Sequence, residues 1–202
     1  MVCIFLVLIG IVAMVGNQRS GDVRRHALAG HAGRQAEQIA RSAIEEALAS
    51  LTPDTLFGSG KMNAQGQFES SFLTELDGQG LVERDDVGNP VRLKFPAALV
   101  LEIKPEAIIR MYEPDRTVKK IDPVKVRPLS FTAANWGVVQ LQATVVVEAG
   151  AQTATRIITE ERQVAFDPAL PNHLRIDRAS LRSLVQRTAT VAEDVQYTVT
   201  DH

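Results

Sequence analysis

The chain of 202 residues is 45% hydrophobic, which is enough for one packed core with an appendage. Its 22 basic and 24 acidic residues are mixed along the sequence and give a formal net charge of -2, so a nucleic-acid partner is not expected. The single cysteine, Cys3, excludes an internal disulfide framework and a cysteine-based metal site.

The first sixteen residues, MVCIFLVLIGIVAMVG, form an uncharged apolar run. A helix of that length spans about 24 Å at about 1.5 Å per residue, slightly less than the roughly 30 Å hydrocarbon core of a bilayer. We predict that residues 1–16 form a hydrophobic transmembrane or assembly helix. A removed signal peptide is the alternative, but a basic n-region and a small-residue cleavage site are both missing. The side chains assigned to this helix are Val2, Ile4, Phe5, Leu6, Leu8, Ile9, Ile11, Val12 and Val15.

An alanine-rich amphipathic pattern follows and predicts a stalk helix over residues 17–52. Apolar residues recur at three- and four-residue intervals, so they form one stripe along the helix. We expect this stripe to pack on the protein's own β-sheet. The stripe positions are Ala36, Ile39, Ala40, Ala43, Ile44, Ala47 and Leu48.

The polar face and the end of the stalk helix are also marked in the sequence. Glu37 and Arg41, and Arg41 and Glu45, are oppositely charged pairs four residues apart, each worth a few tenths of a kcal/mol. Gly33 costs about 1 kcal/mol relative to alanine, so the first half of the helix needs neighbours to be stable. Thr52-Pro53 ends the helix, because a residue before proline is disfavoured in the helical region.

Residues 53–202 are predicted to form a β-rich globular head, and its first part, residues 53–90, is rich in glycine and loops. A short helix across Phe68 to Leu76 interrupts this loop-rich start. Strand signals begin with the alternating residues from Leu99 to Lys104. Val124 to Val126, bounded by prolines on both sides, is expected to be an edge strand.

The clearest strands form a hairpin. Val138 to Glu148 alternates apolar and polar residues, Ala149-Gly150-Ala151 is a credible turn, and Gln152 to Phe166 returns as the partner strand. The alternation is imperfect around Glu160-Glu161-Arg162, which indicates a β-bulge there or a slip in the assigned register.

The end of the chain is predicted to hold a short helix from about Asp177 to Arg187 and a last strand from Val195 to Thr200. The expected fold class is therefore α+β. A long N-terminal helix packs on an antiparallel β-sheet, and a short C-terminal helix follows.

Catalytic motifs are missing from the sequence. It contains no G-x-S-x-G, no H-E-x-x-H and no C-x-x-C, so we do not expect an enzyme. An unfamiliar site remains the alternative, and its candidate residues are Asp85, Asp86, Glu160, Glu161 and His173. No cofactor is expected. Calcium at Asp77, Asp85 and Asp86 is conceivable, but a solvated acidic turn is favoured because their spacing does not fit an EF-hand.

The order of apolar helix, alanine-rich amphipathic helix, loop and antiparallel strands resembles the type IV pilin and pseudopilin family. The segment AEQIARSAIEEAL, residues 36–48, is similar to the corresponding helix of minor pilins that act in pilus assembly. The hairpin of residues 138–166 is similar to the long sheet hairpins of those proteins. Phe5 is a departure, since most major pilins carry a glutamate at the fifth position of the mature chain.

The resemblance implies a function in assembly. A membrane-anchored subunit would act in a type IV pilus or in a type II secretion-like filament, with other pilin-like subunits or envelope assembly proteins as partners. It would lie in the inner membrane with the head on the periplasmic or extracellular side. Arg19, Arg24 and Arg25 after the apolar run conflict with that orientation under the positive-inside rule. The alternative is a bitopic envelope protein whose soluble domain binds or scaffolds other proteins without forming a filament.

Overall fold

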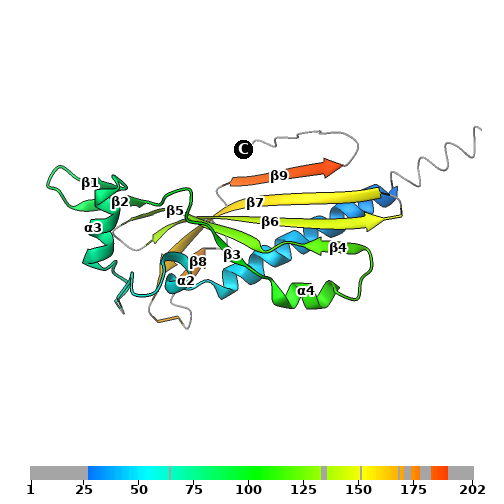
Figure 1. The fold of residues 1–202 in the computed structure, drawn as a ribbon, viewed down its shortest axis with the longest axis horizontal. Coiled ribbons are helices and arrows are strands. Elements are labelled where there is room, and N and C mark those ends of the chain that lie inside the picture. Colours follow the sequence, from blue (N-terminus) through cyan, green and yellow to red (C-terminus); the bar gives the residue numbers. More distant parts are fainter. Residues whose placement is uncertain are drawn as a thin grey trace, which may run out of the picture.

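A long helix over residues 27–50 lies across one face of a large antiparallel sheet (Figure 1). This arrangement comes from a computed structural model that describes residues 27–63, 65–132, 136–150, 152–167, 169–170, 174–177 and 183–190. The apolar run of residues 1–16 and the first part of the predicted stalk lie outside the described residues. The fold is α+β, as the sequence predicts.

The remaining described helices are short and the strands form a nine-stranded sheet. The helices are α2 (Pro53–Phe57), α3 (Ser70–Gly78) and α4 (Glu106–Tyr112). The strands are β1 (Val82–Arg84), β2 (Pro90–Lys94), β3 (Leu101–Ile103), β4 (Val118–Ile121), β5 (Val124–Thr132), β6 (Trp136–Ala149), β7 (Gln152–Phe166), β8 (Leu174–Asp177) and β9 (Ser183–Thr190).

The hairpin of β6 and β7 forms the centre of the sheet. The two strands pair without interruption from Trp136 opposite Ala165 to Ala149 opposite Gln152, and Gly150 turns the chain with a φ of 65°. The predicted bulge near Glu160 is therefore wrong. The alternation is broken there because a glutamate faces the helix, where arginine side chains neutralise it.

Shorter strands cover the two outer edges of this hairpin. β5 and β4 pair with successive parts of β6, and β8 and β9 pair with successive parts of β7. β5 also pairs with β2 and β3, so the expectation of an edge strand at Val124 to Val126 is wrong. A register shift between Pro128 and Ser130 lets β5 carry a proline inside the sheet, because the bulge removes the need for a ladder donor there.

The predicted C-terminal helix is also wrong. Asp177 closes β8 opposite Gln163, and Ser183–Thr190 is strand β9 along β7. The apolar spacing suggests a helix, but pairing with β7 satisfies the backbone groups of both strands. The predicted strand from Val195 to Thr200 lies outside the described residues.

The loop-rich start of the head holds more structure than predicted. The expected helix near Phe68 to Leu76 is present as α3. The long helix ends at residue 50, and Thr52 caps α2, since its side chain accepts a hydrogen bond from the Thr55 amide in a reciprocal capping box.

The core lies between the long helix and the sheet. From the long helix come Ala32, Ala36, Ile39, Ala40, Ala43, Ile44, Ala47 and Leu48, and Leu51 follows directly after the helix; all are at most 2% exposed. Their sheet partners in the same cluster include Val139, Leu141, Ala143, Val145, Val147 and Ile158. Burying such side chains stabilises the fold by about 25 cal/mol per Å² of apolar surface.

A second packing centre consists of phenylalanines. The rings of Phe57, Phe68, Phe72, Phe95 and Phe131 lie with centroids 4.9 to 6.4 Å apart. Gly137 makes room for this cluster, because a Cβ there would lie 2.4 Å from the Phe131 ring. The cluster ties α2 and α3 to β2 and β5, and so fixes the part of the head that carries the β1–β2 hairpin.

Candidate functional site

One edge of the long helix carries a row of charged side chains above β7. Glu37, Arg41 and Glu45 follow at intervals of four residues, so they lie in line along the helix. On β7, alternate residues face the helix, and these include Glu160 and Arg162 as well as buried Ile158 and Val164. Helical and strand periodicity together bring the two charged rows face to face.

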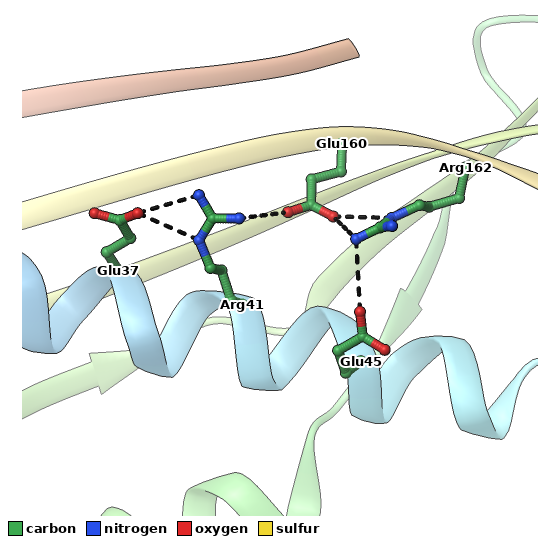
Figure 2. A network of polar contacts seen from close by, with 5 residues as sticks. All are labelled: Glu37, Arg41, Glu45, Glu160 and Arg162. Carbon is green, nitrogen blue, oxygen red and sulfur yellow. Dashed lines mark hydrogen bonds and ion pairs between the residues drawn. The ribbon is translucent and has the colours of Figure 1, made fainter. Parts of the chain in front are cut away.

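Glu160 lies at the centre of the resulting network and is 1% exposed, the one fully buried charged residue among those the structure describes (Figure 2). Its Oε2 accepts hydrogen bonds from Arg162 Nη2 at 2.6 Å and Nε at 3.0 Å. Its Oε1 accepts one from Arg41 Nη1 at 3.4 Å. A buried carboxylate is tolerated only with such partners, because leaving water costs an ion several kcal/mol.

The network continues in both directions along the helix. Arg41 Nη2 and Nε donate to Glu37 Oε1 at 3.1 and 3.2 Å, and Arg162 Nη2 lies 3.5 Å from Glu45 Oε1. Figure 2 shows the five side chains as one chain of alternating charges between helix and strand. Arg41 and Glu45 are 41% and 45% exposed, so water screens these outer contacts.

This charge pattern discriminates between positions of the helix on the sheet. A slip of the helix by four residues, about 6 Å, would keep the apolar stripe on the sheet but change which charged residues face β7. Such a slip in either direction would replace Arg41 by Glu37 or Glu45 opposite Glu160. Two carboxylates would then face each other in a buried site, which is strongly unfavourable. The network therefore disfavours these slipped positions, and fixing a register is the best-attested role of buried charges.

Gly33 lies opposite Arg156 of β7, nearer the start of the helix than the Glu160 network. A Cβ at this position would lie 2.5 Å from Nη2 of Arg156, which faces the helix from β7. The missing side chain thus leaves space for a guanidinium. The buried Nε and Nη1 of Arg156 have no hydrogen-bond partner in the described part of the chain.

The other edge of the long helix holds the α4–β4 excursion, residues 104–121. Glu46 Oε1 and Oε2 accept hydrogen bonds from the amides of Ala107 at 2.8 Å and Ile108 at 2.9 Å, and so cap the start of α4. Gln35 Nε2 donates to Asp115 Oδ2 at 2.8 Å. Hydrogen bonds from Thr117, with a smaller contribution from Gln35, hold the pKa of Asp115 below its ordinary value. Both long edges of the helix are therefore fixed by polar contacts.

The acidic residues singled out in the sequence do not form one cluster. Asp77 on α3 accepts hydrogen bonds from Arg84, and Asp85 accepts from the amides of Val87 and Asn89 within the β1–β2 turn. Hydrogen bonds from Asn89 lower the pKa of Asp85. Among the described residues no group of three metal-ligating side chains occurs, and the calcium hypothesis stays untested.

The residues of the alternative catalytic site are not brought together either. Asp85 and Asp86 lie in the β1–β2 turn, separated from β7 by β5 and β6 in the sheet order. Glu160 faces the helix, whereas Glu161 accepts a hydrogen bond from Gln140 on the other face. His173 lies outside the described residues. Sequence reasoning missed the Glu160 network, and the available signal was a glutamate that shares the helix-facing side of β7 with buried Ile158 and Val164.

Comparison with protein-family models, curated proteins and solved structures finds no match. Within the described ranges, from residue 27 onwards, no helix is long and apolar enough to cross a bilayer.

Proposed function

We propose that this chain is a membrane-anchored minor pilin- or pseudopilin-like subunit that acts in assembly of a type IV pilus or a type II secretion-like filament. The observation that carries this proposal is the course of the long helix. Its apolar stripe is buried against one face of the sheet. Its first described turn lies at the same end of the long axis as the β6–β7 turn (Figure 1). The apolar residues 1–16 precede that turn in the sequence.

In this proposal the apolar segment and the head have different roles. The apolar segment holds the subunit in the inner membrane, with the head on the periplasmic or extracellular side, and then packs against its counterparts in a filament. Apolar helices gain little from the hydrophobic effect when they meet in lipid, so small residues that permit close approach matter. Gly10, Ala13 and Gly16 supply such positions. The helix–sheet interface then fixes the head on this segment, and no chemical step is involved.

Fractionation of the native cells tests the proposal with two variants of the full chain. Deletion of Val2–Val15 should release the head from the membrane fraction. A matched variant, Gly10→Leu/Ala13→Leu/Gly16→Leu, keeps the segment apolar and should stay in the membrane but disappear from sheared surface filaments. External protease should digest the head of the wild-type chain in spheroplasts.

Each outcome has a distinct meaning. A membrane-bound chain that never enters the filament fraction supports the bitopic alternative. Unchanged membrane association after the deletion overturns both readings, and a head protected from external protease overturns the proposed orientation.

A further inference from the structure

The α4–β4 excursion carries an open groove that is lined by apolar and basic side chains. Its volume is about 410 Å³, which lies in the range of small binding sites. Its apolar lining comes from Ile109 and Tyr112 of α4 and from Val118 and Ile121 of β4. Lys104, Lys119 and Lys120 stand around it with one acidic residue, Glu113, so the lining favours an apolar group flanked by negative charge.

The groove lies on an accessible surface. α4 has no buried residue, and Met111 on it is 66% exposed. The three lysines pair with Glu106, Glu148 and Asp122, but their side chains are 52 to 66% exposed. Exposed ion pairs contribute little to stability, so these lysines can exchange their partners for those of a docking surface.

The β1–β2 turn presents matching chemistry. Val87 is 85% exposed, the highest value among the large hydrophobic residues that the structure describes, and Asp85 and Asp86 precede it. The turn is held in shape, because Asp85 accepts hydrogen bonds from the Val87 and Asn89 amides and Arg84 Nη1 donates to the Gly88 carbonyl at 2.6 Å. A preordered turn loses little freedom when it docks.

We propose that the β1–β2 turn of one copy docks into the α4–β4 groove of a second copy, with Val87 against the apolar lining and Asp86 among the lysines. This inference rests on the proposed function and names the partner as another copy of the chain. The turn lies at one end of the long axis, and α4 and β4 lie towards the other (Figure 1). The contact joins two different surfaces, so it can repeat head to tail in a linear array instead of closing into a symmetric pair.

Another use of the same surface, strand addition to β4, is disfavoured. β4 has only four residues, its pairing with β6 shifts register between Val118 and Lys120, and two of its residues are lysines. Short length, irregular register and lysine are the features that protect an edge strand from pairing with another chain.

Disulfide trapping tests the contact in the full chain, in detergent and in a Cys3→Ser background. Chains with Val87→Cys are mixed with chains carrying Ile109→Cys under mild oxidation. The mixture should give dimers well above the level of either variant alone, and a chain with both substitutions should give a ladder of multimers. Thr155→Cys in place of Ile109→Cys is the control, since Thr155 lies on β7 and outside the groove lining.

Charge reversal separates this contact from non-specific collision. Asp86→Lys on the turn-bearing chain, or Lys119→Glu on the groove-bearing chain, should lower trapping by roughly two- to fivefold, the range an exposed charge pair supports. Combining both reversals should restore trapping. The double variant Glu102→Lys/Lys125→Glu, which swaps an exposed cross-strand pair away from both surfaces, should change nothing.

Trapping that ignores charge reversal, or that is as strong for Val87→Cys alone, overturns the proposed contact. Fractionation answers a separate question. If the chain enters filaments but the disulfides do not form, only the docking contact is wrong. If the disulfides form but the chain never enters filaments, the contact stands and the filament function is wrong.

Discussion

Replacing Arg162 by methionine tests whether the helix is fixed by a buried charge network. Arg162 supplies two of the three hydrogen bonds to Glu160, at 2.6 and 3.0 Å, and the Glu160 side chain is only 2% exposed. Removing one partner of a buried pair costs about 3 to 5 kcal/mol. Arg41 remains 3.4 Å from the carboxylate, so we expect the lower end of that range, about 3 kcal/mol.

Thermal unfolding of the detergent-solubilised full chain, followed by circular dichroism, measures the effect. A loss of about 3 kcal/mol should lower Tm by about 6 to 12 °C in a protein of this size. The double variant Glu160→Met/Arg162→Met should recover most of the loss, because it removes the buried carboxylate together with the arginine that supplies two of its hydrogen bonds. The remaining Arg41 and Glu45 are 41% and 45% exposed and can be solvated.

Arg156→Met is the matched control, since Arg156 comes from the same strand and also faces the helix. Its buried Nε and Nη1 have no hydrogen-bond partner among the described residues, so its removal should cost much less than that of Arg162. Equal losses for the two arginine variants would refute the reasoning. So would a double variant that is as unstable as Arg162→Met alone.

Three further predictions concern the ends and edges of the long helix. Gly33→Ala should stabilise the chain by about 1 kcal/mol in an Arg156→Ala background but by less in the wild type. Thermal unfolding of the wild type, the two single variants and the double variant measures the difference, which is the steric cost of a residue 33 side chain against Arg156. The bond from Gln35 to Asp115 should be at full strength above the ordinary pKa range of aspartate and weaken only as the pH falls through the lowered pKa. The Gln35 side-chain amide signals would report this in an NMR titration. Gln35 amide signals that do not change across the titration would contradict this. Thr52→Ala should cost about 1 kcal/mol through loss of the α2 cap, with Thr52→Ser as the tolerated control in the same unfolding assay.

Local periodicity was sufficient to predict the central elements. The i, i+3, i+4 stripe identified the long helix, and strict alternation identified β6 and its partner strand. These elements are long and have one buried face, so the pattern repeats often enough to be unambiguous. The ion pair of Glu37 and Arg41 could also be predicted, because both residues lie on one helix four positions apart.

The remaining features depend on contacts between distant segments. Glu160 interrupts the apolar alternation and suggests a bulge, unless Arg41, 119 residues away in sequence, is known to face it. β9 carries helix-like spacing, but the unpaired edge of β7 beside it determines its conformation. Pro128 indicates an edge strand, and only the register shift in β5 explains why it is tolerated inside the sheet.

The double fixation of the long helix bears on how the head responds to tension. A pull along the helix axis from residue 27 loads the Glu160 contacts and the Gln35 and Glu46 hydrogen bonds in shear, so they must break together. A pull across the axis would peel the same contacts apart one after another. We expect the unfolding rate under load to be much slower in the first direction, so the head should resist extraction best when the helix is drawn lengthwise.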